Sequence, residues 1–177
     1  MQRGRVVMAW VVALFAALST AAPSVAATTG AYNASFNEQT VQRPCPDGVP
    51  AGSFCFTGSG TGTSTPPGDP NAREDFAGFV DFSHPTASTT CPGGMVFPDH
   101  NVVAISTSAG QLFLTTDGFD CPNNGTDDGT WQAQGGTGIF KGATGGGTVS
   151  TRATGGTGTK QDPILSMSTY SGTLTLR

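Results

Sequence analysis

The sequence has 177 residues, of which 11% are charged, and its formal net charge at pH 7 is −4. This length predicts one domain, and the acidic balance argues against nucleic acid and anionic lipid as partners. The 26 glycines, together with frequent Thr and Ser, interrupt every candidate helix and so exclude a mainly helical fold.

The N-terminus has the layout of a secretory signal peptide. Arg3 and Arg5 precede an uncharged apolar run over residues 6–18, and small residues then lead to Ala26. The run is shorter than the roughly 20 residues that a bilayer span needs, so an uncleaved anchor is the weaker alternative. We expect cleavage after Ala26, with residues 1–26 as the signal peptide. Residues 27–177 are then secreted and carry a formal charge of −6, because the two arginines are lost.

Short strand-like segments recur along residues 27–177. Side-chain alternation predicts strands over 31–38, 53–64, 73–83, 102–107, 111–116, 130–134 and 164–176. Phenylalanines at spacing three in segment 73–83 hint at a helix, but its glycine and short length favour a bulged strand. Segments 102–107 and 111–116 are typical of a β-hairpin. The pattern predicts an all-β fold, an antiparallel closed barrel of about eight strands, with a sandwich as the alternative.

All four cysteines follow the expected cleavage site, and an even number in an exported chain indicates two disulfides. Four cysteines allow three pairings. We favour Cys45–Cys55 and Cys91–Cys121, because each would clamp a loop flanked by strand-like sequence and contribute about 3 kcal/mol through loop closure. A metal site is the competing use, but no cysteine pair has C-x-x-C spacing and both histidines lie in loop sequence.

Acid–base chemistry inside a barrel requires a carboxyl group that points inward, where burial raises its pKa. Asp75 and Asp81 are the weak catalytic candidates. Strand alternation places them with Phe79 on one face of segment 73–83, and outward exposure is the default for that face. The opposite face carries Glu74, Phe76, Val80 and Phe82.

Three aromatic residues are weak candidates for lining a ligand pocket: Trp131, Tyr170 and Phe79. Each has the large apolar surface that ligand sites use, and plain core packing is the alternative for each.

The segment 117–129 is rich in Asp, Asn and Gly and reads as a polar loop. Its carboxylates offer oxygen donors that a Ca²⁺ ion could use, but they lack the order of an EF-hand loop. We favour a solvated turn, and so predict no metal site. The weak calcium candidates are Asp117, Asp120, Asp127 and Asp128.

The segment Gly135–Val149, GGTGIFKGATGGGTV, encodes a glycine-rich corner in which Phe140 can anchor the turn onto a barrel end. It closely resembles a signature of allene oxide cyclase and dirigent-like barrel proteins. This resemblance implies an eight-stranded antiparallel barrel with an apolar cavity, and plant members of that superfamily act on or orient small apolar molecules. A corner motif specifies a fold and leaves the chemistry open, since one fold hosts many functions.

The leading hypothesis is therefore a secreted barrel that binds a lipid-like or aromatic molecule, with no assigned reaction. Two alternatives stay open: a non-catalytic structural or surface-interaction module, and a lyase or cyclase that uses a barrel carboxylate. The glycines lack G-x-G-x-x-G spacing and no G-x-S-x-G elbow occurs, so no nucleotide cofactor or catalytic triad is predicted. We expect no cofactor, no nucleic-acid partner and no membrane span after cleavage, and leave the oligomeric state open.

Overall fold

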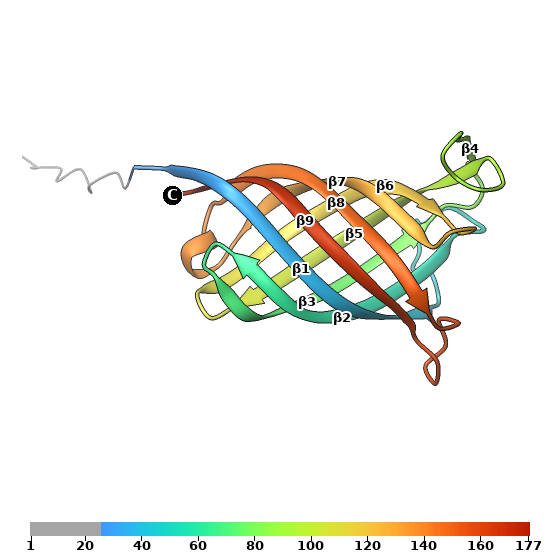
Figure 1. Cartoon of the computed structure of the whole chain (residues 1–177), viewed down its shortest axis with the longest axis horizontal. Coiled ribbons are helices and arrows are strands. Elements are labelled where there is room, and N and C mark those ends of the chain that lie inside the picture. Colours follow the sequence, from blue (N-terminus) through green and yellow to red (C-terminus); the bar gives the residue numbers. More distant parts are fainter. Residues whose placement is uncertain (1–25) are drawn as a thin grey trace, which may run out of the picture.

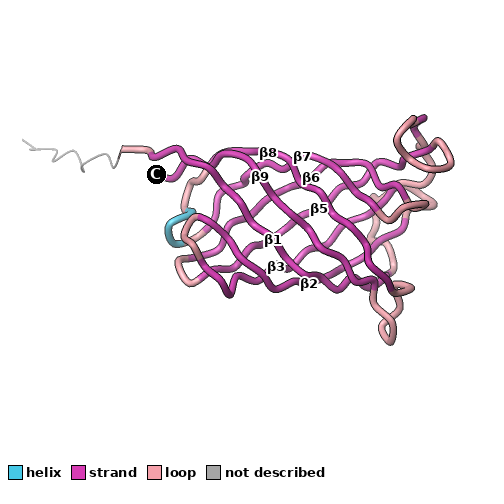
Figure 2. The backbone as a smooth tube through the Cα atoms, in the orientation of Figure 1, coloured by secondary structure: helices cyan, strands magenta, loops and turns pink. Residues whose placement is uncertain are grey.

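The computed structural model describes residues 26–177, which form a closed antiparallel barrel (Figure 1 and Figure 2). The strand order is β3-β2-β1-β9-β8-β7-β6-β5, and pairing of β3 with β5 closes the ring of eight. The short strand β4 pairs with β5 outside that ring. This confirms the predicted all-β barrel. The elements are β1 (Thr28–Arg43), β2 (Phe54–Thr65), β3 (Asp69–Val80), β4 (Thr86–Ala87), β5 (Met95–Thr107), β6 (Gly110–Cys121), β7 (Thr126–Gly136), the 3₁₀ turn η1 (Gly138–Phe140), β8 (Thr144–Gly155) and β9 (Ile164–Leu176).

Several strands are longer than the sequence predicted. β6 runs to Cys121 and β7 begins at Thr126, so the prediction of a polar loop over 117–129 is wrong for most of that segment. Asp, Asn and Gly are depleted in strands and favoured in turns, which explains why the composition pointed to a loop. The bulge predicted in segment 73–83 is also wrong, because β3 pairs in continuous register over residues 73–80. A register shift instead occurs in β2, between Gly62 and Ser64.

One end of the barrel interior is packed solid around two aromatic rings. Paired positions form the row Trp131, Gly147, Gly172, Tyr32 across β7, β8, β9 and β1. The two glycines leave space over the sheet, and the rings of Tyr32 and Trp131 meet edge to face with centroids 5.2 Å apart. The Trp131 Nε1–H donates to the carbonyl oxygen of Ser171 at 3.2 Å. Around this pair lie Phe36, Ile105, Leu112, Leu114, Phe140 and Leu174.

The glycine-rich segment Gly135–Val149 closes the packed end. Its turn η1 inserts Phe140, which is fully buried, whereas Ile139 is largely exposed. The Ile139 N–H donates to the Ala109 carbonyl at 3.1 Å and so joins η1 to the β5–β6 turn. A Cβ at Gly138 would lie 2.0 Å from that carbonyl oxygen, so only glycine permits the contact.

The opposite end carries the long connections between strands (Figure 1). Both disulfides belong to these connections. Cys45–Cys55 closes the β1–β2 loop, and Cys91–Cys121 ties the segment before β5 to the end of β6. Both predicted pairings are confirmed. Two disulfides are consistent with an extracellular protein. The predicted signal peptide, residues 1–26, lies outside the described residues apart from Ala26. Within residues 26–177, no helix has the length and apolar character needed to cross a membrane.

Candidate functional site

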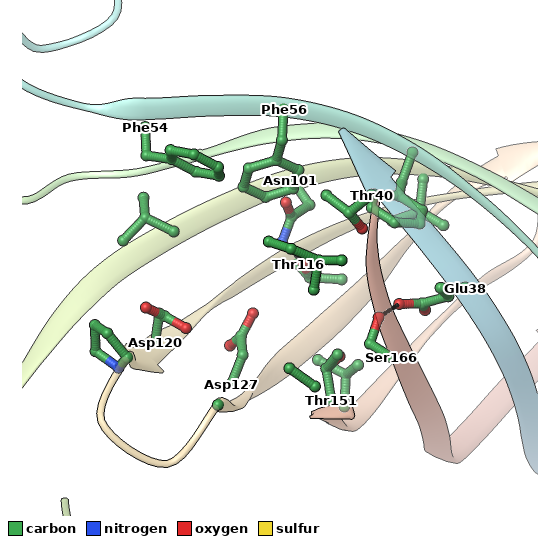
Figure 3. A pocket seen from close by; sticks show the side chains of 18 of the residues that line it. Glu38, Thr40, Phe54, Phe56, Asn101, Thr116, Asp120, Asp127, Thr151 and Ser166 are labelled. Carbon is green, nitrogen blue, oxygen red and sulfur yellow. Dashed lines mark hydrogen bonds between the residues drawn. The ribbon is translucent and has the colours of Figure 1, made fainter. Parts of the chain in front are cut away.

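The disulfide-bearing half of the barrel contains a cavity of about 400 Å³ that is open to solvent. Figure 3 shows Asp120 and Asp127 on one side of it and Phe54 and Phe56 across from them. The cavity therefore combines an aromatic wall with carboxyl groups. Its apolar lining includes Phe54, Phe56, Phe76, Val80, Phe82 and Ile164, and its acidic lining consists of Glu38, Glu74, Asp120 and Asp127.

The floor of the cavity is a pair of glutamates that meet over a glycine. Strand pairing places Ser166, Glu38, Gly60 and Glu74 in one row across β9, β1, β2 and β3. A Cβ at Gly60 would lie 3.1 Å from Glu38 Cγ, so the missing side chain leaves room for the two glutamates. Ser166 Oγ donates to Glu38 Oε2 at 2.8 Å (Figure 3). The polar layer separates the packed end from the open cavity.

Glu74 is a buried acid whose surroundings favour the neutral form. Only 1% of it is exposed, and burial raises its pKa well above the ordinary value, with the charge and hydrogen bond of Glu38 as further causes. Tyr170 donates its O–H to Glu74 Oε1 at 2.5 Å, and Ser168 Oγ donates to Oε2 at 3.5 Å. Burial and then Glu74 raise the pKa of Tyr170 as well. Glu74 is thus positioned as a proton donor at the cavity floor.

A second carboxyl group cluster lies toward the mouth, on β5, β6 and β7. Asp99 pairs with Gly118, and Asp120 pairs with Asp127 across β6 and β7. A Cβ at Gly118 would lie 2.7 Å from Asp99 Oδ1 and 3.0 Å from Asp127 Oδ1, so this glycine lets the two carboxyl groups approach each other. Asn101 Nδ2 donates to Asp99 Oδ2 at 2.8 Å. Asp99 Oδ1 and Asn101 Oδ1 are buried without a hydrogen-bond partner among the described residues.

Proximity and burial keep this cluster partly protonated. Burial raises the pKa of Asp127 to about 9, and the charges of Asp99 and Asp120 add to the effect. Burial also raises the pKa of Asp99 to about 6, and burial followed by the charge of Asp99 raises the pKa of Asp120 to about 6. At neutral pH, Asp127 therefore holds a proton that it shares with its neighbours.

No lysine, arginine or histidine of residues 26–177 lines the cavity, and the charge of His100 lowers the pKa of Asp99 only as the smallest of its causes. The ion pairs of this part of the chain join His84 to Asp81 and His100 to Asp117, which are not cavity residues. Every lysine and arginine there is exposed: Arg43, Arg73, Lys141, Arg152, Lys160 and Arg177. The interior acids consequently balance their charge only by protonation.

The three aromatic residues predicted to line a ligand pocket lie in different parts of the structure. Tyr170 lines the cavity. Trp131 lies in the packed end, 1% exposed, where its ring contacts Tyr32. Phe79 does not line the cavity, and its ring lies 6.0 Å from the imidazole of His100 on β5. Among the three, only Tyr170 is brought to the site.

The acidic residues predicted as catalytic or calcium-binding candidates also lie in different places, because alternate residues of a strand face opposite sides of the sheet. Asp75 is exposed. Of the weak calcium candidates, Asp120 and Asp127 line the cavity, whereas Asp117 and Asp128 are exposed. In residues 26–177, no group of three or more His, Cys, Asp or Glu side chains is arranged to hold a metal ion.

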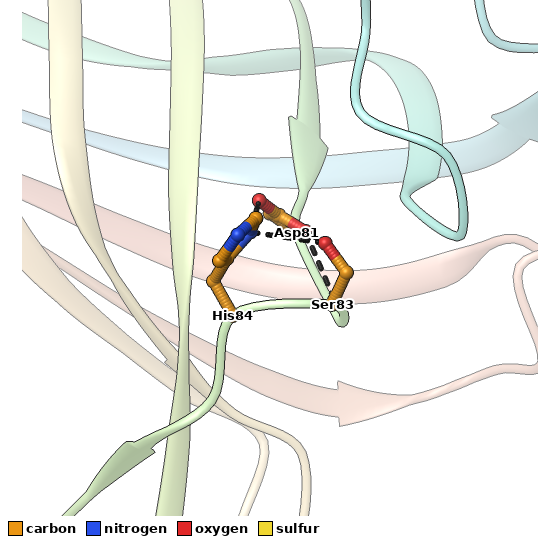
Figure 4. Close-up of polar contacts among 3 residues, drawn as sticks. All are labelled: Asp81, Ser83 and His84. Carbon is orange, nitrogen blue, oxygen red and sulfur yellow. Dashed lines mark hydrogen bonds and ion pairs between the residues drawn. The ribbon is translucent and has the colours of Figure 1, made fainter.

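Asp81 directly follows β3 and forms a local trio with Ser83 and His84 (Figure 4). It is only 7% exposed, so the outward exposure predicted for its face is wrong at this residue, because the trio covers it. His84 Nδ1 contacts both Asp81 Oδ2 at 2.7 Å and Ser83 Oγ at 3.0 Å, and Ser83 Oγ donates to Asp81 Oδ1. A catalytic triad needs the two imidazole nitrogens to serve different partners, so this trio is a turn-stabilising network. The hydrogen bonds from Ser83 and then His84 lower the pKa of Asp81.

Sequence reasoning missed Glu38, Glu74 and Asp99 as site residues. Glu38 continues the alternation of Tyr32, Ala34 and Phe36, and that pattern was available in the sequence.

The chain matches no family model, and comparison with curated proteins finds no significant match. The functional assignment therefore depends on the geometry and chemistry of the cavity.

Proposed function

We propose that the protein is a secreted, ligand-binding barrel of the allene oxide cyclase and dirigent-like type, which takes up a small molecule with an apolar, aromatic body. The observation that carries the proposal is the cavity of about 400 Å³ beside a solidly packed half-barrel. Its size and mixed apolar and polar lining are typical of small-molecule sites. A barrel used only to display loops would gain stability from a filled interior, so the open half disfavours a purely structural role.

The aromatic wall supports an aromatic or flat apolar ligand. Phe56 contacts Phe54 and Phe76 with ring centroids 6.0 and 6.3 Å away, and Phe82 contacts Phe97 at 4.8 Å. Gly58 faces Phe76, whose Cζ would lie 2.2 Å from a Cβ there, so the glycine gives the ring its place against β2. Covering this surface would contribute about 25 cal/mol for each Å² of apolar area removed from water.

Two further features support the family and the export. Gly135–Val149, the segment that resembles the family signature, forms the corner that its glycines and Phe140 predicted, and the barrel has the eight strands that the resemblance implies. Both disulfides lie in residues 27–177 behind a segment with signal-peptide layout, which supports secretion.

Filling the cavity is expected to weaken the binding of an apolar probe strongly. The fluorescence of N-phenyl-1-naphthylamine should rise and saturate on titration with the purified protein. Thr151→Trp places a large ring inside the open half and should weaken binding by about tenfold or more, since 1.4 kcal/mol already corresponds to tenfold. Thr148→Trp is the matched control, because Thr148 is exposed on the same strand. Equal binding by both variants would contradict the proposed site.

An acid-catalysed reaction in the same cavity is the second candidate, favoured by the buried Glu74 at its floor, whose pKa is raised and whose carboxyl group is bonded to Tyr170. With styrene oxide as probe, Glu74 would protonate the epoxide oxygen, the C–O bond would break, and water would add and return the proton. We expect faster ring opening than in buffer, and loss of that acceleration in Glu74→Gln. A rate equal to that in buffer alone would eliminate this candidate.

A further inference from the structure

The proposed ligand cavity has an excess of negative groups that nothing in its own walls neutralises. Four carboxyl groups line it, and Asp99 lies behind them at 5% exposure. Buried charges in proteins are paired or lose their charge by protonation, and an isolated buried carboxylate is costly. Since every lysine and arginine of residues 26–177 is exposed, these carboxyl groups keep their protons unless a bound molecule supplies positive charge.

We propose that the ligand is an organic cation, an amine or quaternary ammonium with an aromatic or apolar body, and that its charged group binds at Asp120 and Asp127 and displaces a proton. This inference rests on the proposed function, because it specifies the ligand of the same cavity.

The polar atoms of the mouth cluster are short of hydrogen-bond donors, because Asp99 depends on a proton that Asp127 shares with it. Apart from the Asp127 proton, Asp99 Oδ1 has no hydrogen-bond donor among the described residues, although Asp99 is almost wholly buried. The oxygen of the Asn101 amide, a residue that lines the cavity, is also buried without a donor. Buried acceptors without a donor are rare and costly, and they concentrate at functional sites. A cationic group at Asp127 would stabilise these acceptors: an amine would donate a hydrogen bond, and a quaternary ammonium would act through its charge.

The opposite wall suits the rest of such a ligand. Phe54 and Phe56 face Asp120 and Asp127 across the cavity (Figure 3). Aromatic faces attract cations and also pack against apolar groups, so one molecule can contact both walls. A bare divalent ion would use neither the aromatic surface nor the volume of about 400 Å³.

Binding of a cation is coupled to proton release. Asp127 is protonated at neutral pH in the empty cavity, because its pKa is raised to about 9. A positive charge beside it favours the carboxylate, so the bound form gives up the proton and affinity rises with pH up to about pH 9. Neutral Thr151 is the cavity residue that faces Asp127 from β8. The charged or titratable groups around the cluster are Asp99 and His100 on β5, Asp117 and Asp120 on β6, Asp128 on β7 and the exposed Arg152 on β8.

Calorimetric titration with three naphthyl probes of like shape tests the proposal. They are (1-naphthylmethyl)trimethylammonium, 1-naphthylmethanol and 1-naphthoate, and the first keeps its charge at every pH. We expect the cation to bind about tenfold or more tightly than the alcohol, and the anion to bind most weakly. In buffers of different ionisation enthalpy at pH 7, binding of the cation should release up to roughly one proton, and binding of the alcohol none.

Variants separate this inference from the proposed function. Asp127→Asn should lose the proton release and most of the preference for the cation over the alcohol, and Asp120→Asn should reduce the preference by itself. The neighbouring Asp128→Asn is the control, because Asp128 is exposed and bonds Ser150. Equal binding of alcohol and cation would overturn this inference and keep the proposed function, whereas no binding of any probe would overturn both. Competition by millimolar calcium chloride against the cation, lost in Asp127→Asn, would assign the cluster to a metal instead.

Discussion

The protein should become less stable as the pH rises from 5 to 8. Asp99, Asp120 and Asp127 have folded-state pKa values of about 6, 6 and 9, and Glu74 is raised well above its ordinary value. In the unfolded chain such groups lose their protons near pH 4, so above that pH the folded state binds more protons than the unfolded state. The slope is about 1.4 kcal/mol per pH unit for each group within its window.

The windows follow from the individual shifts. The stabilisation that comes from protonated carboxyl groups is fully present below about pH 4. It is lost as the pH rises to about 6 for Asp99 and Asp120, and to about 9 for Asp127. Asp69 and Asp81 have lowered pKa values and act in the opposite sense, but only at more acidic pH. Greatest stability is therefore expected in mildly acidic solution.

Thermal unfolding followed by circular dichroism at pH 5, 6, 7 and 8 measures this dependence. Each kcal/mol lost should lower the midpoint by about 2–4 °C for a domain of this size. Asp127→Asn should flatten the profile, because asparagine has the shape of the protonated side chain and does not titrate. Asp128→Asn should keep the slope. A midpoint that is constant or rises from pH 5 to 8 in the wild type would show that these carboxyl groups are ionised in the folded state.

Replacing Trp131 by alanine is expected to lower the free energy of unfolding by about 3–5 kcal/mol. Trp131 is 1% exposed, its ring packs against Tyr32, and its N–H is bonded to the Ser171 carbonyl. The glycines at 147 and 172 have no side chain with which to fill the resulting space.

Urea unfolding at pH 5 provides the measurement. Trp131→Phe retains an aromatic ring and should cost less than the alanine variant, while Phe113→Ala is the surface control, since Phe113 is 39% exposed on β6. A loss below about 1 kcal/mol for Trp131→Ala, similar to that of an exposed site, would mean that the packed end contributes little to the fold.

Local patterns in the sequence predicted the barrel and the disulfides, because alternation and loop position are properties of short segments. The two faces of segment 73–83 were also separated correctly: Asp75 is exposed, whereas Glu74 and Phe76 line the cavity. Alternation alone does not say which face of the strand is interior. The catalytic candidates predicted from the sequence were therefore Asp75 and Asp81 rather than Glu74. Which face is interior depends on how the whole strand is buried in the barrel.

The site itself depends on long-range register, which a single sequence does not contain. Glu38 and Glu74 meet because β1 and β3 both pair with β2 at Gly60. Asp99 and Asp127 likewise approach each other only where β6 presents Gly118 between their strands. A glycine opposite each acid pair is a signal that becomes readable once the register is known, since a side chain there would keep the carboxyl groups apart.

Site-resolved titration of the Asp and Glu carboxyl carbons by ¹³C NMR tests most directly whether the cavity holds neutral acids that await a cation. The account predicts that Glu74 and Asp127 remain protonated at pH 7 in the free protein, and that saturating (1-naphthylmethyl)trimethylammonium shifts the titration of Asp127 to lower pH. Titration of both residues near pH 4, unchanged by the cation, would contradict it.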